Sequence, residues 1–99
     1  MRAIWTERAL VRLEEISDFI AEDSPQIVRS LIERIFSATE QLEESPNSGD
    51  AAPEKGDDSV RQLICEPYRI IYQVGEVVEI LTVRHSRRLF DSQEVDGQS

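Results

Sequence analysis

The chain has 99 residues and a formal net charge of −9 at pH 7, with 39% hydrophobic and 31% charged side chains. These values predict one soluble domain with a single core. They exclude a membrane span, because no apolar run approaches the ~20 residues that cross a bilayer. The acidic balance also argues against a generic nucleic-acid binder, which carries a broad basic face.

The cysteine and histidine content limits the chemistry further. Cys65 is the only cysteine and cannot form an internal disulfide, which fits a reducing cytosol. The N-terminus has no long apolar segment with a small-residue cleavage site, so no signal peptide is expected. His85 is the only histidine, and no Cys/His cluster has metal-ligand spacing. We therefore expect a cytoplasmic protein with no metal and no cofactor.

The first half of the chain predicts a strand followed by two helices. Arg2–Trp5 is a short apolar segment, and Thr6 can cap a first helix that ends near Glu22. Ser24-Pro25 starts a second helix, because proline at the first helical position loses no hydrogen bond, and this helix ends near Glu44. Apolar residues recur at helical spacing in both; in the first helix they are Ala9, Leu13, Ile16 and Ile20, with Leu10 and Phe19 widening the stripe.

The second half predicts a loop followed by three strands. Residues 45–59 are rich in Pro, Gly and acidic side chains and read as loop. Val60–Cys65, Tyr68–Val74 and Val77–Val83 are rich in β-branched and aromatic residues, and Gly75-Glu76 between the last two indicates a hairpin turn, with Gly75 supplying a positive φ. The expected fold is α+β: an N-terminal strand, an antiparallel helical hairpin, then a three-stranded antiparallel sheet with the helices on one face.

Positive charge gathers at the end of the last strand. Acidic side chains outnumber basic ones by eight in residues 1–58 but by only one in residues 59–99. The candidate functional residues in this region are Arg69, Arg84, His85, Arg87 and Arg88. Charge alone leaves open whether they form a binding site or simply the solvent face of a sheet. The acidic helical half would steer a basic partner toward itself.

The order of these elements, with PYRIIYQV followed by VEILTVRHSRR, resembles the RelE/ParE toxins of bacterial toxin–antitoxin modules. The opening IWTERALVRLEEISDFIAEDSP is similar to the family's first strand and first helix. The resemblance covers residues 3–90, and it implies one toxin domain over residues 1–90, with residues 91–99 as a flexible acidic tail. It also implies a ParD-like cognate antitoxin as partner.

The family resemblance implies two possible activities. RelE-like members cleave mRNA on the ribosome, whereas ParE-like members inhibit DNA gyrase without chemistry of their own. This chain has Val60 and Gln62 where RelE-like nucleases carry basic residues, and Phe90 where they often carry a late tyrosine. The ParE-like activity is therefore favoured, with no direct sequence-specific binding of nucleic acid.

The site residues follow from the resemblance. For the gyrase inhibitor, the predicted contact surface comprises Arg69, Arg84, His85, Arg87, Arg88, Leu89 and Phe90. For the nuclease, Arg69 and Arg87 would contact phosphate and His85 would transfer a proton. Two further alternatives remain open: a non-toxic homologue that acts as a binding module, and an Arg69 that forms an ion pair with a helix carboxylate.

Overall fold

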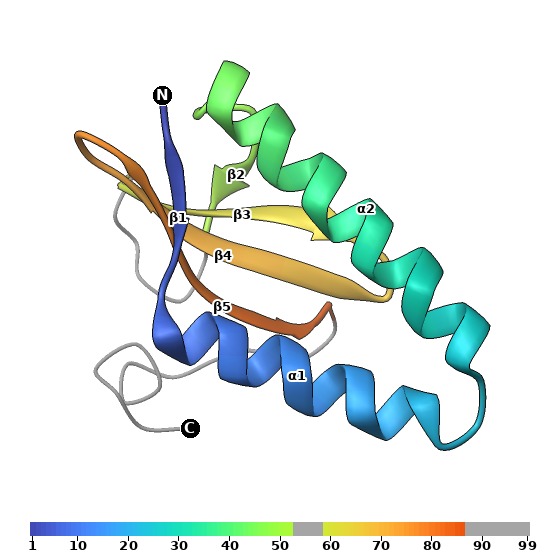
Figure 1. The fold of residues 1–99 in the computed structure, drawn as a ribbon. Coiled ribbons are helices and arrows are strands. Elements are labelled where there is room, and N and C mark those ends of the chain that lie inside the picture. The colour runs from blue at the N-terminus through green and yellow to red at the C-terminus, as the bar shows by residue number, and fades with distance from the viewer. Residues whose placement is uncertain (53–58, 87–99) are drawn as a thin grey trace.

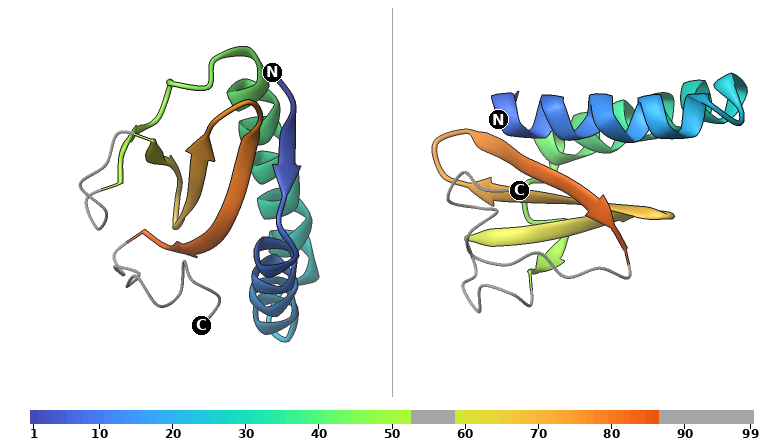
Figure 2. Two further views of the ribbon diagram at one scale, coloured as in Figure 1. Left: turned by 90° about the vertical axis from the view of Figure 1, so that its left-hand side faces the viewer. Right: turned by 90° about the horizontal axis from the view of Figure 1, so that it is seen from below.

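The computed structural model describes residues 1–52 and 59–86. The helices and strands, as Figure 1 shows, are β1 (Ala3–Trp5), α1 (Glu7–Ala21), α2 (Pro25–Glu44), β2 (Asp50–Ala51), β3 (Val60–Cys65), β4 (Tyr68–Val74) and β5 (Val78–His85). Both helices cover one face of the sheet (Figure 2). The predicted α+β fold, with its N-terminal strand, helical hairpin and antiparallel strands, is confirmed.

The sheet has five strands in the order β1-β5-β4-β3-β2. Strands β3, β4 and β5 pair antiparallel, as the sequence predicts. At one edge β1 pairs parallel to β5, with Ala3 opposite Val78 and Trp5 opposite Ile80. At the other edge β2 pairs with β3 inside the segment that the sequence analysis predicted as loop. The three predicted strands are therefore the centre of a wider sheet.

The helix boundaries follow from their capping residues. The Thr6 hydroxyl oxygen accepts a hydrogen bond from the Ala9 N–H at 3.1 Å and donates to the Ile80 carbonyl at 2.8 Å. It therefore caps α1 and ties its start to β5. The Ser24 side chain accepts from the Ile27 N–H, and Pro25 occupies the first position of α2. Both capping predictions are confirmed.

The turn between β4 and β5 differs from its prediction. The Gly75 N–H donates to the Val77 carbonyl at 3.0 Å, and β5 runs from Val78 to His85 rather than from Val77 to Val83. The φ of Gly75 lies outside the left-handed region, so the expectation that Gly75 supplies a positive φ of that region to this turn was wrong. A register shift between Ile71 and Tyr72 places one extra residue in β5.

The main core lies between the helices and the sheet. Leu13, Leu31, Ile35 and Leu42 pack against side chains of β4 and β5, among them Tyr72. The predicted stripe of α1 was too wide, because Leu10 is 50% exposed and Phe19 is 72% exposed. A helix that packs on only one layer buries a narrow stripe, so residues at the stripe's margins remain in solvent.

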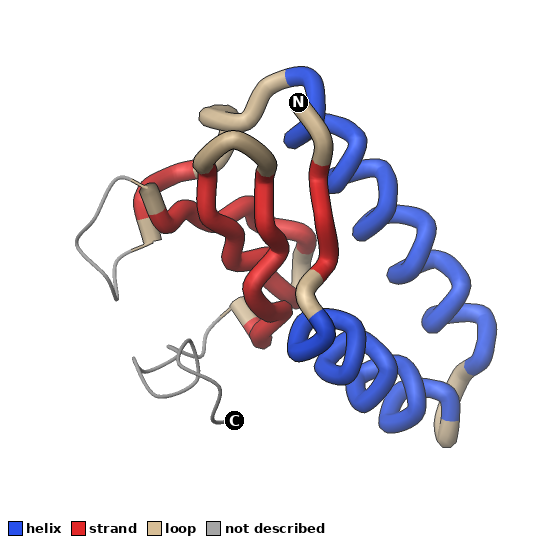
Figure 3. Tube along the Cα trace, turned by 60° about the vertical axis from the view of Figure 1, so that its left-hand side comes forward, coloured by secondary structure: helices blue, strands red, loops and turns tan. Residues whose placement is uncertain are grey.

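A smaller apolar cluster lies on the other face of the sheet. It consists of Ala52, Val60 and Ile71, with the partly buried Leu81 packed against them. Figure 3 shows the strands curving away from the two helices, which form a separate layer. The sheet is therefore buried in part on both faces, which explains the nearly continuous apolar run in β4.

The basic end of the sheet and its candidate binding residues

The pairing of β4 with β5 brings together the predicted basic residues of the two strands. Arg69 lies opposite Arg84, and Tyr68 lies opposite His85. Beyond the strands, the Ser86 N–H donates to the Pro67 carbonyl at 2.8 Å and holds the end of β5 beside the turn that precedes β4. Residues that are about fifteen positions apart in the chain thus form one end of the sheet, which we call the basic end.

Arg69 and Arg84 lie beneath the surface of the basic end rather than on it. Their side chains are 2% and 7% exposed. Because Ile70 points into the core under the helices, its neighbour Arg69 points to the opposite face of the sheet. The Arg69 Nη1 donates to the Gln62 Oε1 at 2.9 Å, so Arg69 contacts the neighbouring strand β3.

His85 is exposed on the helix side of the basic end. Its ring meets the Tyr68 ring edge to face, with 5.8 Å between the centroids. A depression of about 170 Å³ opens beside them. Its lining residues come from α1, β4 and β5: Arg12, Ile16, Tyr68, Val83, Arg84 and His85. The depression thus lies beside the Tyr68 and His85 rings, between α1 and the end of the sheet.

Four predicted contact residues lie outside the described residues. They are Arg87, Arg88, Leu89 and Phe90, which follow Ser86 in the chain. The roles predicted for all seven contact residues therefore remain predictions. The structure does establish that Arg69, Arg84 and His85 share one end of the sheet.

Arg61 has a structural role that the sequence did not reveal. Its guanidinium donates to the Gly49 carbonyl at 2.6 Å from Nη2, and also to the Asn47 carbonyl. The Tyr72 hydroxyl accepts from the Gly49 N–H at 3.1 Å and donates to the Pro46 carbonyl at 2.8 Å. Two side chains of the sheet thus hold the segment between α2 and β2, which the loop prediction did not anticipate.

The remaining reactive group is the Cys65 thiol. Burial raises the pKa of this thiol, and the nearby Arg34 guanidinium partly counteracts the rise. A raised pKa lowers the thiolate fraction at neutral pH, so the geometry favours a packing role for Cys65.

In residues 1–52 and 59–86, no group of three His, Cys, Asp or Glu side chains could hold a metal ion. In the same residues, no helix is long and apolar enough to cross a membrane.

Comparison with known proteins identifies the class. Residues 3–90 match the family described as the ParE toxin of the type II toxin–antitoxin system parDE. The chain belongs to this family of toxins, and its partner within such a system is an antitoxin.

Two curated relatives cover nearly the whole chain. The chain is 40% identical over 89 residues to the putative toxin Y4kP of Sinorhizobium fredii, covering 88% of this chain and 90% of the relative. It is 34% identical over 90 residues to Toxin RelE2 of Caulobacter vibrioides, covering 89% and 98% of the two chains. Both relatives are named as toxins, and the second carries a RelE name.

Two solved structures share the fold. A structure described as the chromosomal ParDE TA system from P. aeruginosa has a TM-score of 0.69 at 25% identity, covering 86% of this chain and 95% of the other. The YoeB/ParE toxin from Agrobacterium tumefaciens has a TM-score of 0.54 at 21% identity, covering 86% and 98%. The second comparison supports the fold alone.

Proposed function

We propose that this toxin acts in the cytoplasm by binding DNA gyrase and inhibiting it, without chemistry of its own, and that a ParD-like antitoxin neutralises it. The observation that carries the proposal is the placement of the strand arginines. Arg69 is 2% exposed and hydrogen-bonded to Gln62, while Arg61 is engaged by the Gly49 and Asn47 carbonyls. These guanidinium groups organise the protein's own polar atoms, whereas a nuclease must present its cations to the phosphate of RNA.

Two positions on β3, Val60 and Gln62, also support action by binding rather than by RNA cleavage. Val60, where RelE-like nucleases carry a basic residue, is 3% exposed and belongs to the apolar cluster behind the sheet. Gln62 accepts the hydrogen bond of Arg69. The group left on the surface is His85, followed in the chain by Arg87 and Arg88. Arginine is enriched at the energetic centres of protein interfaces, so this short basic segment is the contact surface we propose for gyrase.

Replacing His85, Arg87 and Arg88 together by Ala should raise the toxin concentration needed for half-inhibition of gyrase supercoiling by about 10- to 100-fold. His85 is exposed, and surface substitutions change stability little, so we expect the melting temperature to stay the same. The measurement is a supercoiling assay with purified gyrase. A matched control, Arg2→Ala with Arg29→Ala, removes two exposed cations elsewhere and should leave inhibition unchanged. Equal loss in both variants would contradict a specific surface.

Ribosome-dependent cleavage of mRNA is the alternative function, and one observation favours it. Tyr68 and His85 are in ring contact beside a depression that also contains Arg12 and Arg84. An imidazole could take the proton of a ribose 2′-OH, with Arg69 and Arg87 contacting phosphate. Under this alternative, His85→Gln abolishes cleavage of mRNA during translation while the protein stays folded. Under the proposed function, the wild-type protein leaves the mRNA intact.

A further inference from the structure

Three segments from different parts of the chain meet at the turn that joins β3 to β4. The turn consists of Glu66 and Pro67. The Ser86 N–H donates to the Pro67 carbonyl at 2.8 Å, and the Ser86 Oγ donates to the Glu66 Oε2 at 3.1 Å. From α2, the Arg34 Nη1 donates to the Glu66 carbonyl at 2.6 Å. These hydrogen bonds tie α2, the turn and the end of β5 together, and we call Arg34, Glu66, Pro67 and Ser86 the turn clamp.

Glu66 is the central residue of the turn clamp, because its carbonyl and its carboxylate accept hydrogen bonds from two different elements. The carbonyl binds a residue 32 positions away on α2, and the carboxylate binds a residue 20 positions away, after β5. A hydrogen bond to an ionised acceptor contributes more to stability than one between neutral groups. Glu66 therefore links the helical layer to the basic end of the sheet.

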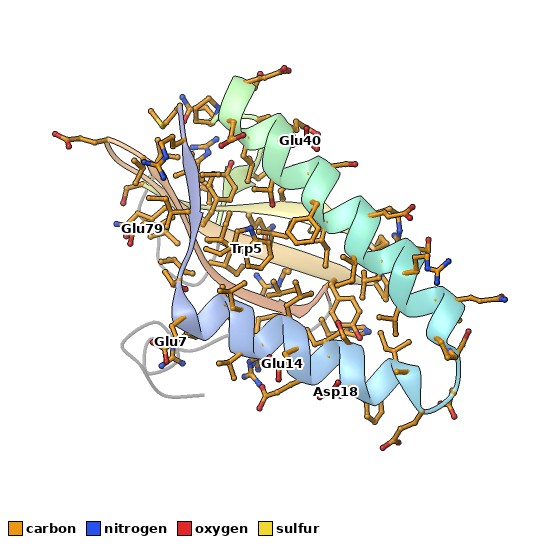
Figure 4. All side chains as sticks on the ribbon, viewed as in Figure 1. Trp5, Glu7, Glu14, Asp18, Glu40 and Glu79 are labelled. Atoms are coloured by element: carbon orange, nitrogen blue, oxygen red, sulfur yellow. The ribbon has the colours of Figure 1, made fainter. Side chains whose placement is uncertain are left out.

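The position of Glu66 differs from that of the acidic side chains on the helices. Figure 4 shows those side chains in the helical layer, along α1 at Glu7, Glu14 and Asp18 and on α2 at Glu40. Glu66 lies instead at the basic end, where a negative charge reduces the positive potential that an acidic partner would meet. The hydrogen bond from Ser86 provides a physical reason for a carboxylate at that place.

Ser86 occupies a sensitive position in the chain. It follows the exposed His85 and precedes Arg87 and Arg88, two residues of the proposed contact surface. The His85 ring is held against Tyr68, the residue after the turn, with 5.8 Å between the ring centroids. The turn clamp and this ring contact together restrict the end of β5. A surface that is ordered before binding loses less conformational entropy when it meets its partner.

We propose that Glu66 is a positioning residue of the target-binding surface. It fixes Ser86, and thereby both the orientation of His85 and the direction in which the chain leaves β5. Arg34 supports this role because it holds the Glu66 carbonyl to α2. The inference rests on the proposed function, since it concerns the same contact surface. Glu66 acts through Ser86 and requires no contact of its own with gyrase.

The turn clamp can be tested without gyrase, through hydrogen exchange of the Ser86 amide measured by NMR. Glu66→Ala should speed this exchange by about 3- to 10-fold, because the Ser86 hydroxyl loses its acceptor. Glu66→Gln should stay within about twofold of wild type, since the amide oxygen still accepts a hydrogen bond. Glu76→Ala, in the exposed turn between β4 and β5, is the matched control and should leave the exchange unchanged. Unchanged exchange in Glu66→Ala would overturn the proposal.

Inhibition of supercoiling tests the positioning role itself. Glu66→Ala should raise the toxin concentration for half-inhibition of gyrase by about 3- to 10-fold. The melting temperature should stay the same, because Glu66 is exposed, and Glu66→Gln should restore inhibition. Ser86→Ala should resemble Glu66→Ala, and the double variant should be no weaker than either, because both changes remove the same hydrogen bond. Additive losses would mean that Glu66 contacts gyrase directly, and would overturn the positioning role.

The two measurements separate this inference from the proposed function. Wild-type protein that fails to inhibit gyrase would contradict the proposed target. The Ser86 exchange would still decide the turn clamp, with faster exchange in Glu66→Ala supporting it and unchanged exchange overturning it. Faster exchange in Glu66→Ala, with inhibition as strong as in wild type, would keep the target and overturn the positioning role.

Discussion

Gly49→Ala should destabilise the folded protein by about 3 kcal/mol and lower its melting temperature by roughly 12–24 °C. A Cβ at this position would lie 2.2 Å from the Gln62 carbonyl oxygen and 2.7 Å from the Tyr72 hydroxyl oxygen. The first contact is with backbone of the β3 strand, which cannot move without breaking the sheet. The second displaces the hydroxyl that binds the Gly49 N–H.

Gly75→Ala is the matched control for this prediction. A Cβ at Gly75 would lie 3.9 Å from the Val77 carbonyl oxygen, and the φ of Gly75 lies outside the left-handed region. Stability should therefore stay the same or rise by up to about 1 kcal/mol, since alanine restricts the unfolded chain. Thermal unfolding followed by circular dichroism measures both variants. Similar melting temperatures for the two would show that Gly49 is not held against β3 as described.

Ile35→Ala should destabilise the protein by about 2–5 kcal/mol, the range for large-to-small changes at fully buried sites. Ile35 is 0% exposed and lies in the core between α2 and the sheet. The neighbouring segments are held by backbone hydrogen bonds, so they can collapse only partly onto the space left behind. Urea unfolding, with the slope compared between variants, measures the effect.

Ile27→Ala provides the control on the same helix. Ile27 lies near the start of α2 and is 55% exposed, so its truncation should change stability by less than about 0.5 kcal/mol. The comparison keeps residue type and helix constant and varies only burial. A large effect at Ile27 would mean that α2 packs through a different stripe from the one described.

Local signals were sufficient to predict most of the fold. The Thr6 and Ser24 side chains cap the two helices, and the Pro25 ring fits the first position of the second helix. The observed bounds of β3 (Val60–Cys65) and β4 (Tyr68–Val74) are the predicted ones. Strand β2 was missed because it has only two residues and depends on Arg61 and Tyr72, which are distant in the chain. No local pattern contains that information.

The candidate site was predictable in position but not in environment. The pairing of Tyr68-Arg69 with Arg84-His85 follows from a hairpin between two recognisable strands. The burial of Arg69 and Arg84 does not follow from the sequence, because charged residues in a strand with polar neighbours are expected in solvent. Likewise, Leu10 and Phe19 are exposed because only a narrow stripe of α1 packs on the sheet, and helical periodicity alone does not determine the width of that stripe.

The most direct test of the central claim uses one preparation of wild-type toxin in two assays: supercoiling by purified gyrase, and cleavage of an mRNA translated by purified ribosomes. A toxin that acts by binding gyrase should inhibit supercoiling in a concentration-dependent manner and leave the mRNA intact. Addition of the cognate antitoxin should restore supercoiling. Cleavage of the mRNA on the ribosome, with supercoiling unaffected, would contradict the claim and make His85 the next residue to replace.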